Sequence, residues 1–193
     1  MNFRMLWLTA LALAATPPAL PQTYFPIGAL PEVAAVHYAR FLTAMHEPSL
    51  YELSRQNPGA EAYRLLWLRS DQRPATVRFV PKPGGTGWFY RRMAGGTGST
   101  LPGGLPENGM SWSWKSRTAS FLTTVDDAGF WNLASGGSDT PGFCSSHWIP
   151  EGVRQGQYRV IDRCSPPETD PIHIIGVRAM RLANLRVHGS QIY

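Results

Sequence analysis

Tyr63-Arg-Leu-Leu-Trp-Leu-Arg69 is the first of three strand-like runs that follow one another closely along the chain. Ala75-Thr-Val-Arg-Phe-Val80 comes next, and the turn cluster 81–86 leads directly into Trp88-Phe-Tyr-Arg-Arg-Met93. Runs rich in β-branched and aromatic residues that are bounded by Gly and Pro are typical of strands joined by tight turns. This stretch therefore predicts an antiparallel sheet.

A fourth strand is expected at residues 110–116, after a long irregular loop at residues 95–109. In this strand Met110, Trp112 and Trp114 alternate with polar residues. Successive side chains of a strand point to opposite faces of the sheet. We therefore expect these three side chains to share one buried face.

The two cysteines lie on either side of a predicted hairpin, whose strands are 147–153 and 157–163. If Val153 pairs with Gln157, Cys144 and Cys164 come to lie almost opposite each other. An even number of cysteines in an exported chain favours a disulfide. Such a bond would close a loop of about 21 residues and stabilise the fold by about 3 kcal/mol. The alternative is a reactive thiol, with His147, which is nearby in sequence, as its base.

The same pairing predicts an ion pair across the hairpin between Glu151 and Arg159. Helical spacing of apolar residues predicts four helices, at 31–44, with Val33 on its apolar face, at 48–54, from a cap at Ser116 or Thr118 to 128, and at 171–185. Gly129 suits the left-handed residue that ends the third helix. The fourth helix has one apolar stripe, formed by Ile172, Ile175, Ala179 and Leu182. Strands linked by hairpins, with helices before and after them, are typical of an α+β domain. We expect one such domain over residues 31–190, with its helices packed on one face of the sheet.

The N-terminus has the parts of a secretory signal. Arg4 precedes an apolar run of 11 residues, and Ala12-Leu-Ala14 fits a cleavage site. We expect a signal peptide at 1–14, a Pro-rich linker at 15–30 and no membrane span after cleavage. The alternative is an uncleaved N-terminal anchor. The predicted location is periplasmic or secreted.

Charged residues make up 16% of the chain, which is well below the roughly 25% of soluble domains, and the net charge is +5. This low charge, with 43% hydrophobic residues, argues against a disordered chain. The basic residues are scattered rather than clustered, so specific nucleic-acid binding is not expected. A basic surface would instead suit an anionic polymer.

The motif search excludes several chemistries. The Gly-rich stretch 95–104 has no Gly-Lys-Ser/Thr ending, so it does not fit a phosphate-binding loop. No Gly-x-Ser-x-Gly nucleophile motif and no His-x-x-x-His pair occurs, and we expect neither a cofactor nor a metal. His46, Glu47 and Glu52 form the one candidate catalytic cluster, as acid and base or as metal ligands. A hydrogen-bonded helix junction explains the same three residues.

A candidate binding surface follows from the strand pattern. Arg64, Arg78, Arg91 and Lys115 fall at alternating strand positions and would form a basic row on an exposed sheet face. With Trp88 exposed beside it, such a row would hold an anionic polymer. The alternative is that exposed strand positions are simply polar.

Several segments resemble a group of exported bacterial proteins of unknown function. They are His46-Glu-Pro-Ser-Leu-Tyr-Glu-Leu-Ser54, Tyr63–Arg69, Gly129-Phe-Trp-Asn-Leu133, Trp148-Ile-Pro-Glu-Gly-Val-Arg-Gln-Gly-Gln-Tyr158 and Asp162-Arg163. The resemblance covers roughly residues 40–185 and implies a single envelope domain. It implies no activity and no site residue.

The sequence therefore favours an exported, non-catalytic binding or interaction protein, whose partner is another envelope protein or an anionic polymer. Two alternatives stay open. One is a hydrolase that acts on an envelope polymer through the His46 cluster. The other is an inhibitor or immunity-type partner that forms a tight stoichiometric complex.

Overall fold

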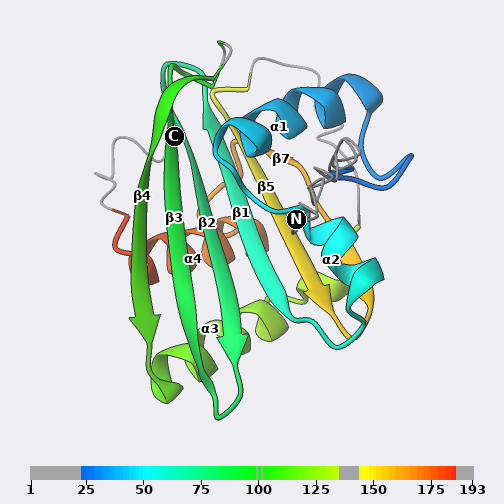
Figure 1. The fold of residues 1–193 in the computed structure, drawn as a ribbon, viewed down its shortest axis with the longest axis vertical. Helices are drawn as coiled ribbons and strands as arrows, with labels where there is room; N and C mark the ends of the chain where they lie inside the picture. The colour runs from blue at the N-terminus through cyan, green and yellow to red at the C-terminus, as the bar shows by residue number, and fades with distance from the viewer. Residues whose placement is uncertain (1–22, 99, 101, 135–143, 186–193) are drawn as a thin grey trace, which may run out of the picture.

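The computed structural model describes residues 23–98, 100, 102–134 and 144–185 (Figure 1). The predicted signal peptide lies outside these residues. The elements along the chain are α1 (Glu32–Ala44), α2 (Leu50–Gln56), β1 (Ala62–Arg69), β2 (Gln72–Lys82), β3 (Thr86–Gly95), β4 (Gly103–Ser113), α3 (Lys115–Asp127), a short 3₁₀ helix η1 (Phe130–Asn132), β5 (Ser146–Arg154), β6 (Gln157–Val160), β7 (Arg163–Cys164) and α4 (Pro171–Leu182).

All seven strands join one antiparallel sheet in the order β4-β3-β2-β1-β5-β6, and β7 pairs with β5. The prediction of a single α+β domain is confirmed. The sheet is continuous because β5 returns to pair with β1 over its whole length, from Ala62 opposite Val153 to Arg69 opposite Ser146. Among the described helices, none has the length and apolar character needed to cross a bilayer.

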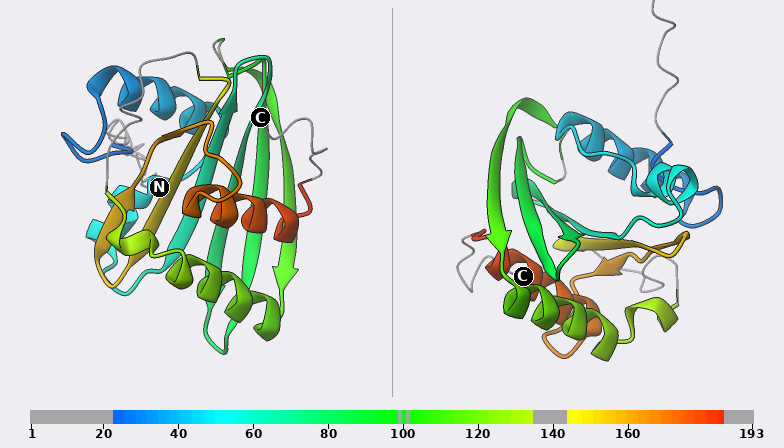
Figure 2. Two further views of the ribbon diagram at one scale, coloured as in Figure 1. Left: turned by 180° about the vertical axis from the view of Figure 1, so that it is seen from behind. Right: turned by 60° about the horizontal axis from the view of Figure 1, so that its bottom comes forward.

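The helices cover both faces of the sheet, whereas we expected them on one face. Figure 1 shows α1 and α2 in front of the sheet, and Figure 2 shows α3 and α4 behind it. Leu65 and Trp67 of β1 enter the core that contains residues of α3 and α4, and Leu66 and Leu68 enter the core that contains residues of α1. A strand covered on both sides is a continuous apolar run. The Leu-Leu-Trp-Leu run in β1 has this pattern.

The front core lies between α1 and the central strands. Tyr38, Phe41 and Leu42 are the buried residues of α1, whereas Val33 is 84% exposed, although we expected it on the apolar face. Residues 23–30 are the described part of the stretch that we expected to be a linker. They contribute three buried side chains to this core, namely Tyr24, Phe25 and Leu30.

β4 is longer than predicted, because it begins at Gly103, within the stretch that we expected to be an irregular loop. Met110 and Trp114 are 59% and 67% exposed, which corrects their expected burial. Met110 is exposed because β4 is the edge strand, and the helices α1 and α2 in front of the sheet lie over β1 and β5 rather than over β4 (Figures 1 and 2). Trp114 lies beyond the end of β4, at the N-cap of α3, so the predicted strand ends earlier than residue 116.

The β5–β6 hairpin differs from the expected pairing by one residue, because Val153 lies opposite Tyr158 and Glu151 lies opposite Val160. A slip of one residue moves every side chain to the other face of a strand. The expected ion pair between Glu151 and Arg159 is therefore absent from the ion pairs of the described residues. The disulfide between Cys144 and Cys164 is confirmed, with an S–S distance of 1.96 Å.

Candidate functional site

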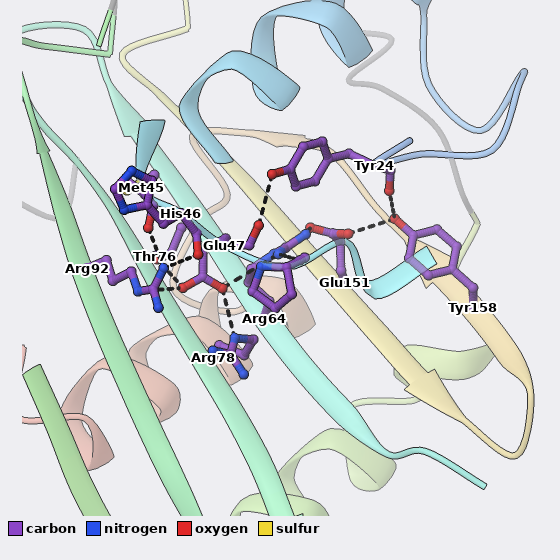
Figure 3. Close-up of polar contacts among 11 residues, drawn as sticks. Tyr24, Met45, His46, Glu47, Arg64, Thr76, Arg78, Arg92, Glu151 and Tyr158 are labelled. Carbon is purple, nitrogen blue, oxygen red and sulfur yellow. Dashed lines mark hydrogen bonds and ion pairs between the residues drawn. The ribbon is translucent and has the colours of Figure 1, made fainter. Parts of the chain in front are cut away.

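Glu47 is placed by the tight turn between α1 and α2. His46 adopts a left-handed backbone conformation with φ of 52°, and the Glu47 N–H donates to Leu42 O at 2.9 Å. The chain reverses there, so the Glu47 side chain turns back beneath α1 onto the sheet (Figure 3). This side chain has no exposed surface.

Three guanidinium groups surround the Glu47 carboxylate. Its Oε2 lies 2.8 Å from Arg78 Nε and 3.6 Å from Arg64 Nη1, and its Oε1 lies 3.3 Å from Arg92 Nε. Thr76 Oγ1 donates to Oε1 at 3.4 Å. A buried carboxylate needs such charged and polar partners to offset its lost hydration.

Arg64 joins Glu47 to a second buried carboxylate. Its Nε and Nη2 donate to Glu151 Oε1 at 2.9 and 2.6 Å, and the Tyr158 hydroxyl donates to Glu151 Oε2 at 2.7 Å (Figure 3). Burial alone would lower the pKa of Arg64, but the Glu151 and Glu47 carboxylates outweigh that effect and raise it. Arg64 therefore stays charged. We call Glu47, Arg64, Arg78, Arg92 and Glu151 the charged network.

The charged network fixes the α1–α2 turn to the sheet. Arg64 Nη1 donates to Pro48 O at 2.5 Å, and Arg92 Nη1 donates to Met45 O at 2.5 Å and also to His46 O. Three arginines on three neighbouring strands thus hold one turn of chain. Two of them reach the surface, since 12% of the Arg78 side chain and 22% of the Arg92 side chain are exposed.

An aromatic surface continues the network along the front of the sheet. The strand register and the alternation of side chains place nine residues on the front of β2, β3 and β4. They form three rows that run across the strands: Thr76–Arg92–Asn108, Arg78–Tyr90–Met110 and Val80–Trp88–Trp112. We call these nine residues the open face. The Trp88 and Trp112 rings lie 4.7 Å apart, and the Arg78 guanidinium lies 4.5 Å from the Tyr90 ring centre.

The structure separates the three predicted catalytic residues. Glu47 is buried in the charged network, whereas the His46 side chain is exposed. Glu52 accepts the Thr23 N–H at 2.7 Å, and the α2 N-cap is formed by the side chain of Ser49. The helix-junction explanation of these three residues agrees with this geometry.

The structure brings together only part of the predicted basic row. Arg64 and Arg78 lie opposite each other, and Trp88 follows on the next strand of the same face. Arg91 lies opposite Val77 and therefore points to the back, where it donates to Ala183 O and Asn184 O at 3.1 Å. Lys115 is the first residue of α3. Because Arg64 is buried, no exposed row of these four residues forms.

Arg92, rather than Arg91, provides the third guanidinium on the front. The sequence indicates this position of Arg92, because Trp88, Tyr90 and Arg92 are every second residue along β3 and therefore point to the same face of the sheet. The partner carboxylate Glu47 had no such signal, because it lies in a turn whose contact with the sheet depends on the packing of α1.

Buried tyrosines give a prediction at alkaline pH. Burial raises the pKa of Tyr38, Tyr63 and Tyr158, and Asp162, Glu61 and Glu151 respectively raise it further. We expect at least three of the seven tyrosines to stay protonated in the folded protein at about pH 11, where exposed tyrosines ionise. Unfolding releases those protons, so their stabilisation is complete below about pH 10 and is lost as the pH rises further.

The measurement is the absorbance of tyrosinate at 295 nm, followed against pH in buffer and in denaturant. Seven tyrosines that ionise together near pH 10 in buffer would contradict the burial of these hydroxyl groups.

Comparisons of the chain with protein-family models, with curated proteins and with solved structures found no match. The candidate site is therefore judged on its own chemistry. Over the described residues, no three metal-ligating side chains converge into a cation site.

Proposed function

We propose that the protein is exported and that its open face binds an anionic polysaccharide of the cell envelope without catalysing a reaction there. The observation that carries the proposal is the group of Trp88, Tyr90 and Trp112 beside two partly exposed arginines, on strands that no helix of the described residues covers in front (Figure 1).

The aromatic rings provide the contact area. Trp88, Tyr90 and Trp112 are partly exposed, and Met110 and Trp114 beside them are exposed. A continuous surface of large apolar side chains is typical of a binding site. Trp and Tyr present a flat apolar face with a polar edge, and the C–H face of a sugar ring packs on such a surface. The Trp88–Trp112 pair lies across two strands, and Trp114, whose ring lies 6.2 Å from that of Trp112, extends it.

Charge selects an anionic ligand. The open face holds Arg78 and Arg92 and no acidic residue among its strand positions. Glu47 is shared among three arginines, so the charged network keeps a net positive charge even with Glu151 counted. A guanidinium fits a carboxylate with two parallel hydrogen bonds, so the carboxylates of an acidic sugar suit these side chains.

The geometry favours binding over hydrolysis at this face. A general acid must reach the substrate to transfer a proton. The Glu47 carboxylate has no exposed surface and is already bonded to Thr76 and the three arginines. Glu47 therefore acts by positioning the arginines.

The disulfide supports the proposed location. Disulfides persist in oxidising compartments such as the bacterial periplasm and the cell exterior, and they are rare in the cytosol. The Cys144–Cys164 bond joins the segment just before β5 to β7, where reduction would loosen the sheet edge.

Binding is tested by calorimetry with polygalacturonate, which carries a carboxylate on every sugar. We expect Trp88→Ala to weaken the affinity about tenfold or more, since aromatic stacking contributes about 1–3 kcal/mol per ring in comparable nucleic-acid sites. Ile174→Ala is the matched control, because Ile174 is an exposed apolar residue on the opposite side of the sheet. Its affinity should equal that of the wild type.

Two further polymers test the selectivity. Dextran lacks charge and should bind weakly, and polygalacturonate binding should weaken as ionic strength rises. Equal binding of dextran would refute the role of the arginines. Tighter binding of oligothymidylate would favour a nucleic acid over a polysaccharide. No binding of polygalacturonate by the wild type would reject the proposal.

A further inference from the structure

A second site lies at the other end of α1, away from the open face. An open pocket of about 490 Å³ forms between the first half of α1, the end of β1 and the start of β5. Pro31, His37, Tyr38, Leu68, Ser70 and His147 are among the residues that line it. Pockets of this size hold small molecules. Neither the open face nor the charged network contributes to it.

Three polar side chains are joined at the wall of this pocket. The Tyr38 hydroxyl donates to Asp162 Oδ2 at 2.6 Å, and His147 Nδ1 lies 3.1 Å from both Asp162 Oδ1 and the Tyr38 oxygen. Asp162 is only 3% exposed, whereas 36% of the His147 side chain is exposed. The carboxylate is thus enclosed and the imidazole borders the pocket.

The two partners of His147 fix its tautomer. A carboxylate accepts, and the Tyr38 hydroxyl has already given its hydrogen to Asp162, so the imidazole hydrogen belongs on Nδ1. Both hydrogen bonds that the described residues make to this ring use Nδ1. Nε2 then carries the lone pair of the ring, and His147 is one of the residues that line the pocket. A histidine oriented by a buried aspartate is the general-base arrangement of many hydrolases.

We propose that His147 is the general base of a hydrolytic site for small carboxylic esters, with Asp162 and Tyr38 as positioning residues. Nε2 takes a proton from water as the water oxygen attacks the ester carbonyl carbon. The tetrahedral intermediate then breaks its C–O bond to the alcohol oxygen, which takes the proton back from Nε2. The products are one acid and one alcohol, and His147 returns to its starting form.

The pocket lining selects the substrate class. Burial lowers the pKa of His37, so this neighbour is neutral at neutral pH. The Arg69 guanidinium is held by Gln72 and by Arg73 O and lies over the Trp67 ring, so it is not directed at a phosphate. A neutral ester therefore fits this pocket better than a phosphate ester.

Tyr38 keeps Asp162 in place through the hydrogen bond from its hydroxyl. Burial and the nearby Asp162 charge raise the pKa of Tyr38, so its hydroxyl remains a donor over the whole neutral range. The strands place His147 and Asp162 beside Tyr38. His147 lies opposite Leu68 of β1, on the face that α1 covers, and Asp162 follows the end of β6.

The test uses the full chain and p-nitrophenyl acetate as the probe ester. General-base catalysis contributes about 10²–10⁴-fold, so His147→Asn should lower the hydrolysis rate at least tenfold. Tyr38→Phe, which keeps the ring, should lower kcat with little change in KM. His46→Asn is the matched control, because His46 is exposed, lies outside the pocket and has a backbone conformation that Asn tolerates.

A chemical readout covers the case in which a variant fails to fold. Diethyl pyrocarbonate modifies the unprotonated imidazole nitrogen, and mass spectrometry locates the modification in the wild-type protein. We expect the loss of esterase rate to follow the modification of His147 and not that of His46. If the rate persists after His147 is modified, or if a folded His147→Asn variant hydrolyses the ester as fast as His46→Asn, the proposal is wrong.

Discussion

Glu47→Gln should lower the free energy of unfolding by about 3–5 kcal/mol, which is the usual effect of removing one partner from a buried ionic cluster. The substitution keeps the shape of the side chain but removes its charge. Three arginines then face a neutral amide, and Arg64, which is fully buried, keeps only Glu151 as a counter-charge. The amide N–H₂ group also meets guanidinium donors, with which it forms no hydrogen bond.

The measurement is urea unfolding followed by tryptophan fluorescence. Glu52→Gln is the matched control, because Glu52 is a half-buried glutamate on the neighbouring helix and accepts a backbone N–H, which an amide oxygen also accepts. It should cost less than about 1 kcal/mol. A Glu47→Gln variant as stable as the control would show that the charged network does not hold the turn to the sheet.

Removing the disulfide should cost about 3 kcal/mol. Cys144 and Cys164 are 20 residues apart in sequence, and the chain-entropy model gives about 3 kcal/mol for a loop of this size. The bond holds the short strand β7 against β5, where only two residue pairs join the strands, His147 with Cys164 and Trp148 with Arg163.

The comparison is between the wild type and the Cys144→Ala/Cys164→Ala double variant, each with and without dithiothreitol. The reductant should lower the stability of the wild type to that of the double variant and leave the double variant unchanged. If dithiothreitol leaves the wild-type unfolding midpoint where it was, the disulfide makes no contribution to stability.

Local patterns in the sequence were enough to predict most of the helices and strands. The apolar stripe of Ile172, Ile175, Ala179 and Leu182 predicted α4, and all four side chains are buried. Gly129 ends α3 in the left-handed conformation that its position indicated. Such patterns involve residues that are close in sequence, so the local sequence is enough to predict the structure that they form.

The errors arose where distant parts of the chain meet. The faces of β1 were not distinguished because its apolar run is compatible with cover on either side or on both. The exposure of Met110 follows from β4 being an edge strand, which alternation along β4 does not reveal. Trp114 is exposed where the chain leaves β4 and enters α3.

The charged network was predictable only in part. Alternation placed Arg64 and Arg78 on one face, but the pairing of Glu151 with Arg64 required knowing that β5 lies beside β1. A hairpin register wrong by one residue had assigned Glu151 to Arg159 instead. The pocket residues were missed for a similar reason, because Tyr38, His147 and Asp162 come from three separate segments and no spacing motif joins them.

Hydroxyl-radical footprinting of the wild-type protein, with and without saturating polygalacturonate, tests the central claim most directly. Radicals oxidise exposed aromatic and sulfur side chains, so mass spectrometry reports which of them a ligand covers. The account predicts protection of Trp88, Met110, Trp112 and Trp114. Trp131, a partly exposed ring packed against the core on the opposite side of the sheet, should stay unchanged. Saturated binding that leaves these four side chains as reactive as in the free protein would place the ligand elsewhere and contradict the account.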